Sequence, residues 1–361
     1  MRRVFYEKVC SSVVGTPGCW HYRSCYGSYK SEYKLDIVPS ITTAWGQGAQ
    51  YFADLVRTRT DGRVNIKVYP NAQLTTGKQT NAFMMIRNGA IDFACQSSIN
   101  WSPQVVELNL FAMPFFVAEQ PDRYAAMDAI TGGKSGAMIK TAVELKGVKV
   151  LAYGENGFRE LTNSKREIHT PEDFKGLKLR VVGSKLFLDT YKAMGANPIA
   201  MNWSDTMTAL QQGVVDGQEN PINTFYPVKV YEYNKYMLDW HCVIDPTLFS
   251  VNPGVWKSFT KEDQAIIEEA AKEAAKFQIA LARIGLDDGW AYDYLAKMNK
   301  LPEVTDWYKE LAKVGMVVTK LTPEQTAAFA ALAKPVRDEW YSKFPQIMDQ
   351  AVADMAAVAK K

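Results

Sequence analysis

Hydrophobic and polar positions alternate in short segments near the start of the chain, and a helical periodicity separates two of these segments. Residues 33–39 and 64–69 alternate with the two-residue period of a strand. Between them, residues 44–60 place apolar side chains on one face of a helix, and residues 91–95 form a third apolar strand. This β-α-β order predicts an α/β fold with a parallel sheet wrapped by helices.

The same rhythm restarts further along the chain and indicates a second lobe. Residues 148–153 have the pattern of another strand, after which Gly154 and Gly157 mark a crossing into a unit that starts with a strand over residues 158–163. Residues 248–252 have the pattern of a return strand. Two crossings between two lobes predict a hinge.

The C-terminal part of the chain is helical in its periodicity. Helix starts are expected at Thr260 and Thr322, each followed three residues later by a capping partner. The alanine-rich run of residues 268–297 is long enough to brace both lobes. We therefore expect long C-terminal helices that hold the two lobes together.

These patterns divide the chain into four parts. Residues 1–32 form a leader, residues 33–156 lobe I and residues 157–247 lobe II. Residues 248–361 return to lobe I and supply helices that pack across both lobes. A chain of 361 residues is long enough for two such cores.

Composition and charge exclude several classes of function. The chain is 47% hydrophobic and 22% charged, which is ordinary for a globular protein. No stretch approaches the roughly 18 to 20 apolar residues of a membrane span. Residues 1–33 hold five basic and two acidic side chains, so the remainder carries 37 of each sign and has no basic excess for nucleic acid.

The leader has some features of an export signal and lacks others. It starts with Arg2 and Arg3, but the apolar run that follows is short and is broken by Gly15 and Pro17. We interpret residues 1–32 as a defective or misread signal peptide that stands outside the fold. Three of the five cysteines (Cys10, Cys19 and Cys25) lie there, and Cys95 and Cys242 are interpreted as buried apolar side chains rather than a disulfide.

One arginine stands in an otherwise apolar strand of the second lobe. Residues 170–176 predict one helical turn with a threonine cap, and residues 176–182 predict a short buried strand that carries Arg180 near its carboxyl end. Ligands bind at that edge of an open α/β sheet. A guanidinium there suits a carboxylate, sulfonate or phosphate, and an internal ion pair is the alternative.

A second block of sequence connects this strand to a known family. Residues 176–180 (Gly-Leu-Lys-Leu-Arg), together with residues 216–221 (Asp-Gly-Gln-Glu-Asn-Pro), resemble the solute receptors of TRAP transporters, the tripartite ATP-independent periplasmic type. The resemblance runs from about Tyr33 to the C-terminus. It implies a two-lobed fold like that of periplasmic binding proteins and a monomer in the periplasm. It also implies delivery of a small organic anion to the transporter's membrane subunits.

The resemblance also implies which residues hold the anion. A first arginine, Arg159, and the strand arginine, Arg180, would reach the ligand, and Asn220 would supply an amide contact. Arg166 competes with Arg159 for the first role, although its sequence setting is that of a solvated turn. A C4-dicarboxylate, another carboxylic acid and a short sulfonate all remain open.

Three further residues are candidates for the ligand site. Trp203 and Trp101 each stand in an Asn-Trp-Ser sequence, which is compatible with a pocket wall as well as with a core. Lys78 follows a loop in which relatives often carry acids, and it could approach an anionic ligand.

Enzymatic chemistry finds little support in the sequence. The glycine-rich segments lack the spacing of nucleotide-binding loops, and the three histidines have no metal-ligand spacing. We predict no cofactor and no metal. The alternative is a lyase-like enzyme acting on an organic acid in the same cleft, with Glu155 or Glu219 as its base.

Overall fold

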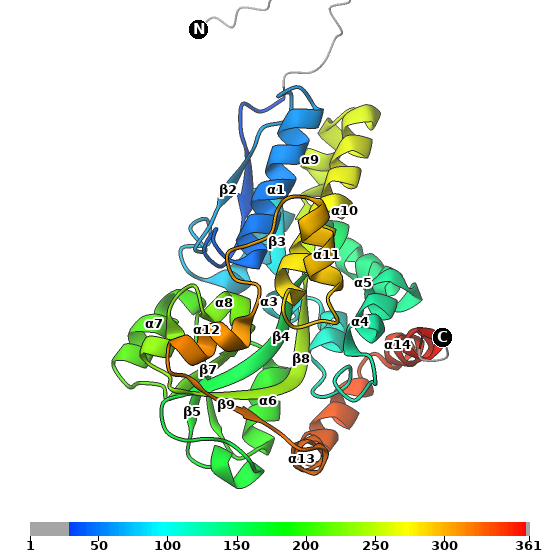
Figure 1. Cartoon of the computed structure of the whole chain (residues 1–361). Coiled ribbons are helices and arrows are strands. Elements are labelled where there is room, and N and C mark those ends of the chain that lie inside the picture. Colours follow the sequence, from blue (N-terminus) through cyan, green and yellow to red (C-terminus); the bar gives the residue numbers. More distant parts are fainter. Residues whose placement is uncertain (1–28, 359–361) are drawn as a thin grey trace, which may run out of the picture.

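A mixed β-sheet runs the length of the molecule and joins the two lobes (Figure 1). The computed structural model describes residues 29–358, and in that range the sheet has nine strands in the order β2-β1-β3-β8-β4-β7-β5-β6, with β9 paired to β8. The strands are β1 (Tyr33–Asp36), β2 (Ile66–Tyr69), β3 (Phe93–Ser97), β4 (Lys149–Asn163), β5 (Lys178–Val181), β6 (Asn197–Ala200), β7 (Gly217–Asn220), β8 (Tyr236–Val251) and β9 (Val317–Lys320).

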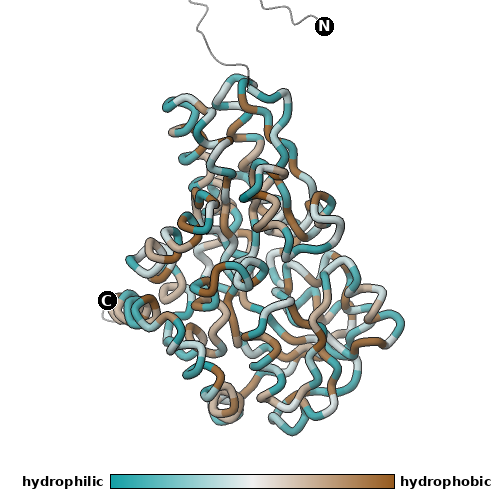
Figure 2. Tube along the Cα trace, turned by 180° about the vertical axis from the view of Figure 1, so that it is seen from behind, coloured by the Kyte–Doolittle hydropathy of each residue, from teal (hydrophilic) through white to brown (hydrophobic). Residues whose placement is uncertain are grey.

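The predicted parallel sheet of lobe I is confirmed. β1 pairs in parallel with both β2 and β3, and helix α1 (Ala44–Arg59) connects β1 to β2. The helix begins where Thr43 caps it, because the Thr43 hydroxyl accepts a hydrogen bond from the Gly46 amide at 3.0 Å. Figure 2 shows hydrophobic and hydrophilic positions interspersed along the trace, and in α1 the buried residues Ala49, Phe52, Ala53 and Val56 recur at helical spacing, as expected for a helix that covers a sheet on one side.

Two long antiparallel strands, β4 and β8, carry the chain between the lobes. The sequence predicted two separate strands on either side of Gly154 and Gly157, whereas the structure joins them into the single strand β4. The pairing of β4 with β8 shifts register between Glu155 and Gly157, which indicates a β-bulge at the crossing. The predicted lobe boundaries at residues 156/157 and 247/248 therefore fall inside continuous strands.

Strand β8 has a further irregularity just beyond this crossing. Arg159 pairs with Val243 and Leu161 with Leu238, so the four residues 239–242 of β8 face the single residue Glu160 of β4. We call residues 239–242 the β8 bulge. The Glu160 carboxylate accepts hydrogen bonds from the Trp240 amide at 2.9 Å and the His241 amide at 3.1 Å, which holds the bulge against β4.

Lobe II follows its sequence prediction closely around Arg180. A single 3₁₀ turn (Pro171–Phe174) starts at Thr170 with a capping box to Asp173. Gly176 then adopts a φ of +80°, a value that favours glycine, and leads into β5. Helix α6 (Lys185–Ala193) follows as expected.

The C-terminal helices are arranged differently from the prediction. The run of residues 268–297 is not one helix, because α10 (Lys261–Arg283) ends before Gly285 and α11 (Trp290–Lys297) begins after Gly289, and both glycines have positive φ. Helix α10 packs on α1 and β4, α13 (Pro323–Tyr341) on α6, and α14 (Pro345–Val358) on α4 and α5. Several shorter helices, rather than one long helix, thus pack against the elements of the two lobes.

The remaining helices and turns fill the connections between these elements. They are the 3₁₀ turns η1 (Gln79–Asn81), η2 (Val106–Ala112), η3 (Pro171–Phe174) and η4 (Val230–Glu232) and the helices α2 (Ala82–Arg87), α3 (Ser98–Trp101), α4 (Arg123–Gly132), α5 (Lys134–Leu145), α7 (Trp203–Gln211), α8 (Ile222–Phe225), α9 (Pro253–Ser258) and α12 (Trp307–Lys313).

The end of the predicted leader belongs to the folded unit. The Tyr29 hydroxyl donates to Asp263 at 2.7 Å, and the Lys30 ammonium pairs with Asp92 at 2.5 Å. Residues 1–28, with Cys10, Cys19 and Cys25, lie outside the described residues. Cys95 and Cys242 are free and buried, as predicted. From residue 29 to residue 358, no helix has the length and apolar character needed to cross a membrane.

Candidate functional site

A small cavity lies between the two lobes, and four of the six predicted ligand residues line it. These are Arg159, Arg180, Trp203 and Asn220. The cavity offers only about 20 Å³ to the centres of water molecules, which is room for one or two waters. The remaining lining residues are Val38, Pro39, Trp45, Gln79, Ser97, Asn100, Val182 and Thr224.

Arg180 is a buried cation without a carboxylate partner among the residues that the structure describes. Its side chain is 1% exposed, and its Nε and Nη2 atoms both donate to the Met201 carbonyl oxygen, at 3.0 and 2.9 Å. The guanidinium carbon lies 5.4 Å from the centre of the Trp203 ring. Within residues 29–358 no acidic side chain forms an ion pair with it. Burial lowers the pKa of Arg180 to about 10, so the side chain stays charged at neutral pH.

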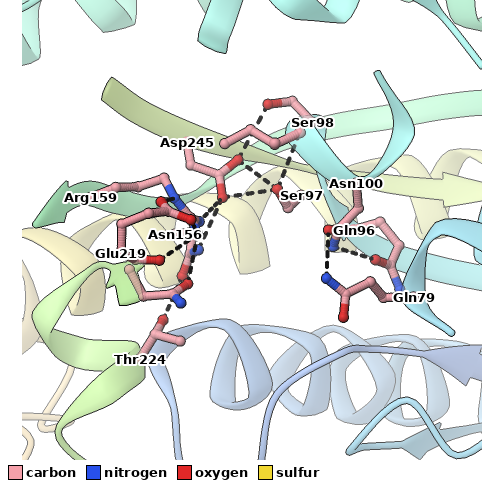
Figure 3. A network of polar contacts seen from close by, with 12 residues as sticks. Gln79, Gln96, Ser97, Ser98, Asn100, Asn156, Arg159, Glu219, Thr224 and Asp245 are labelled. Atoms are coloured by element: carbon pink, nitrogen blue, oxygen red, sulfur yellow. Dashed lines mark hydrogen bonds and ion pairs between the residues drawn. The ribbon is translucent and has the colours of Figure 1, made fainter. Parts of the chain in front are cut away.

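Arg159 is the opposite case, because two buried carboxylates neutralise it (Figure 3). Its Nε and Nη2 atoms pair with both oxygens of Glu219, and Nη1 donates to Asp245 at 2.9 Å. Nη2 also donates to the Asn220 side-chain oxygen at 2.9 Å. Burial alone would lower the pKa of Arg159, but the Glu219 and Asp245 carboxylates raise it above its ordinary value.

Asp245 connects this ion-pair cluster to both lobes. Its carboxylate accepts hydrogen bonds from Ser97 of β3 at 2.8 Å and from Asn156 of β4 at 3.0 Å (Figure 3). The Asn156 side-chain oxygen in turn accepts from Thr224 of α8 at 2.7 Å. These hydrogen-bonded side chains thus form a fixed polar layer beneath the cavity, where β4 and β8 pass between the lobes.

The two carboxylates considered as catalytic bases are both held by arginine. Glu219 binds Arg159, and Glu155 binds the Arg283 guanidinium through contacts of 3.0 and 2.6 Å. Glu155 does not line the cavity. Neither carboxylate is therefore placed to accept a proton from a bound molecule.

The lobes touch each other directly beside the cavity. The Trp203 amide of lobe II donates to the Gln79 side-chain oxygen of lobe I at 2.7 Å. Gln79 donates in turn to Asn100 at 3.3 Å, and Asn100 donates to Gln96 at 3.4 Å (Figure 3). This chain of amides links the first turn of α7 to the end of β3.

Trp101 and Lys78 lie away from the cavity, and in each case a neighbouring residue lines it instead. Trp101 is fully buried in the hydrophobic core, where its ring packs edge-on against Phe83 at 5.2 Å. Lys78 is exposed to solvent, whereas Gln79 faces the cavity. Asn100 lines the cavity in place of Trp101. The sequence indicated two segments that border the cavity, but it could not fix the direction of each side chain.

Arg166 does not reach the cavity. Its exposed guanidinium donates to the backbone oxygens of Asp173 and Lys175 at 2.9 and 2.8 Å. Sequence reasoning missed Trp45, whose indole nitrogen donates to the Cys95 carbonyl at 2.7 Å while the ring lines the cavity. Its position in the first turn of α1, at the carboxyl edge of the sheet, is a signal that could have identified it.

The buried carboxyl of Asp36, at the end of β1, is expected to make the stability of the protein depend on pH. The residue is fully buried, its Oδ2 accepts from Gln96 at 2.7 Å, and Oδ1 has no hydrogen-bond partner among residues 29–358. Burial raises the pKa of Asp36 to about 7 from an ordinary value of 3.8. The folded protein therefore binds this proton more tightly than the unfolded chain, and the contribution of Asp36 to stability falls as pH rises from about 4 to 7.

Replacing Asp36 with asparagine is expected to remove this pH dependence. The full shift corresponds to at most about 4 kcal/mol, so Asp36→Asn should unfold at a higher temperature than the wild type at pH 8 and show little difference at pH 4. Melting curves of both proteins from pH 4 to 8 measure the effect. A difference in melting temperature that stays the same from pH 4 to 8 would show that the buried carboxyl does not titrate in this range.

Comparison with known proteins gives the class and then the family. The two-lobed sheet and the cavity between its lobes define a solute-binding protein of the type that serves transporters. Residues 37–285 match the family model described as bacterial extracellular solute-binding protein, family 7. The chain belongs to this family, whose members are transport receptors and not enzymes.

Solved structures and curated relatives agree with this assignment. A TRAP periplasmic solute-binding protein from Ralstonia eutropha H16, with bound (S)-2-acetolactate, shows a TM-score of 0.83 and 46% identity over 92% of this chain and 100% of that chain. The 2,3-diketo-L-gulonate-binding periplasmic protein YiaO of Escherichia coli K12 is 34% identical over 83% of this chain and 84% of its own. A succinate-bound TRAP solute-binding protein from Sulfurospirillum deleyianum shows a TM-score of 0.76 and 31% identity, covering 89% and 98% of the two chains.

Proposed function

We propose that this receptor binds a compact organic monocarboxylate in the interlobe cavity, with Arg180 as the main contact of the carboxylate. The observation that carries the proposal is the lack of an acidic partner for the buried Arg180 guanidinium within residues 29–358. Burying an unpaired charge is costly, so an anion at this position would compensate it. Charged hydrogen bonds to a carboxylate contribute about 1.5 to 3 kcal/mol each.

The charge balance of the cavity favours one carboxylate over two. The positive charge of Arg159 is already offset by Glu219 and Asp245, which leaves Arg180 as the cation available to a ligand. Arg159 then acts mainly by holding Asn220, whose amide lines the cavity. A dicarboxylate would bring a second buried charge for which no second free cation lines the described cavity.

The apolar part of the wall favours a short aliphatic body. Val38, Pro39, Trp45 and Val182 line the cavity beside the polar groups. A molecule with one carboxylate, one or two further oxygens and a small branched alkyl group would use both parts of the wall. The ligand named for the Ralstonia relative, acetolactate, has this chemistry, whereas succinate, named for the less similar relative, has two carboxylates.

Ligand entry would require the lobes to separate. The cavity is too small for an organic acid, and the hydrogen bond from the Trp203 amide to Gln79 joins the two lobes beside it. We place the hinge at the irregular pairing of β4 and β8, where both strands pass between the lobes. The receptor would work as a monomer in the periplasm and hand its ligand to the membrane subunits of a TRAP transporter.

A calorimetric comparison of matched acids tests the proposal. Branched 2-hydroxy and 2-oxo monocarboxylates of four to six carbons should bind at least tenfold more tightly than succinate or malate, and they should be recovered unchanged. Small-angle scattering on the same samples should show a more compact molecule with the bound acid. Tighter binding of the dicarboxylates would overturn the monocarboxylate proposal, and no binding of any acid would overturn the assignment of the cavity.

A further inference from the structure

Glu160 of β4 lies close to Asp239 and His241 of the β8 bulge, on the side of β4 opposite to Arg159. The Nδ1 atom of His241 lies 3.1 Å from Oδ1 of Asp239 and 3.8 Å from Oε1 of Glu160. One ligand atom from each residue lies within 4.8 Å of the others. This is the one group of three or more such side chains in residues 29–358 that could enclose a metal ion.

The two carboxylates keep one oxygen each for a further partner. Glu160 is 3% exposed, and its Oε2 is occupied by the amides of Trp240 and His241. Asp239 is 7% exposed, and its Oδ2 accepts from the Tyr308 hydroxyl at 2.7 Å. The other oxygen of Asp239, Oδ1, is buried, points at His241 and has no hydrogen-bond partner among the described residues.

We propose that Glu160, Asp239 and His241 bind one divalent transition-metal ion, through Oε1, Oδ1 and Nδ1 respectively. Two carboxylate oxygens and one imidazole nitrogen form a ligand set that suits Mn²⁺, Fe²⁺, Co²⁺ or Zn²⁺ better than Ca²⁺ or Mg²⁺. Hydrogen bonds from Tyr308 and the bulge amides already orient both carboxylates, as outer contacts do in metal sites.

A second cavity reaches this site at His241, which lines it, whereas Glu160 and Asp239 lie behind the lining. It has a volume of about 600 Å³ and is lined by His241, Phe158 and Arg123, among other residues. Phe158 and Arg159 are adjacent on β4 and line different cavities, so the metal site and the ligand cavity lie on opposite faces of the strand. Water from the larger cavity can complete the coordination of the ion.

Nearby cations limit the affinity but leave the three ligand atoms free. The Lys320 ammonium lies 3.6 Å from Asp239, on Oδ2 and not on Oδ1. Arg123 lines the cavity and lies over the Phe158 ring at 5.9 Å. The competing arrangement is a hydrogen bond from His241 to Asp239 with no ion. A bound ion would instead join β4 to the β8 bulge and stabilise the crossing between the lobes.

Manganese binding by the full chain tests the proposal. Mn²⁺ is the probe because Cys10, Cys19, Cys25 and His21 offer thiolate and imidazole groups that would attract Zn²⁺ elsewhere. After treatment with a chelator, electron paramagnetic resonance should detect one Mn²⁺ bound per chain at micromolar to submillimolar concentration, and Mn²⁺ should raise the melting temperature.

Two variants and one control make the result specific. His241→Asn keeps a residue that tolerates the φ of +54° at this position, and Asp239→Asn keeps an acceptor for Tyr308. Each should weaken Mn²⁺ binding at least tenfold without changing organic-acid binding. His169→Asn removes an exposed histidine that also lies beside a carboxylate, Glu167, and should have no effect. Unchanged affinity in both site variants, or millimolar binding that all proteins share, would mean an adventitious ion only and would overturn the proposal.

Discussion

Replacing Arg180 with lysine is expected to weaken binding of the organic acid by more than tenfold while the fold is retained. Arginine presents two parallel N–H donors to a carboxylate, whereas an ammonium is a point charge on a flexible chain. Burial would also lower the pKa of a lysine at this position and so reduce its positive charge. Because Arg180 has no ion-pair partner within residues 29–358, its loss leaves no buried carboxylate uncompensated.

Titration calorimetry and melting temperature, measured on the same preparation, check this result. Arg166→Lys is the matched control, since Arg166 is exposed and its guanidinium donates only to backbone oxygens among residues 29–358. The control should bind as the wild type does. Unchanged affinity in Arg180→Lys would remove Arg180 from the site, and a collapsed melting temperature would indicate that the arginine serves the fold instead.

The local elements of the fold could be predicted from the sequence because short-range rules decide them. The cap at Thr170, the glycine turn at Gly176 and the strand with Arg180 all appear in the structure. The continuity of β4 could not be predicted in this way. Gly154 and Gly157 have the appearance of strand breakers, and only the pairing with β8 makes them part of a bulged strand.

The candidate site shows the same limit at the level of single side chains. The segments that contain Lys78 and Trp101 do border the cavity, but the residues of these segments that line it are Gln79 and Asn100. A one-residue difference in a short helical turn moves a side chain by about 100°, and tertiary packing decides this rotation. The Trp101 side chain points into the hydrophobic core, because its large ring packs there against Phe83.

The sequence also could not distinguish the two arginines from each other. Both stand in strands that the sequence predicts for lobe II, and the family resemblance implies the same role for both. Their difference arises from long-range pairing: the antiparallel contact of β4 with β7 brings Glu219 to Arg159, and β8 brings Asp245. No carboxylate reaches Arg180 in the same way within the described chain. The structure thus separates an arginine whose charge is offset by buried carboxylates from one that has no acidic partner in residues 29–358.

Replacing Arg159 with methionine is therefore expected to destabilise the whole protein. The Glu219 and Asp245 side chains are fully buried, so both would lose their compensating charge in one step. Breaking a buried ion pair by removing one partner costs about 3–5 kcal/mol. Urea unfolding should show this loss in Arg159→Met, whereas Arg180→Met should lose binding with a much smaller change in stability. The double variant Arg159→Met, Glu219→Gln should recover part of the loss, because it leaves one unpaired carboxylate and not two. Equal stability of Arg159→Met and the wild type would contradict the structural role of this ion pair and would return Arg159 to the direct ligand contacts.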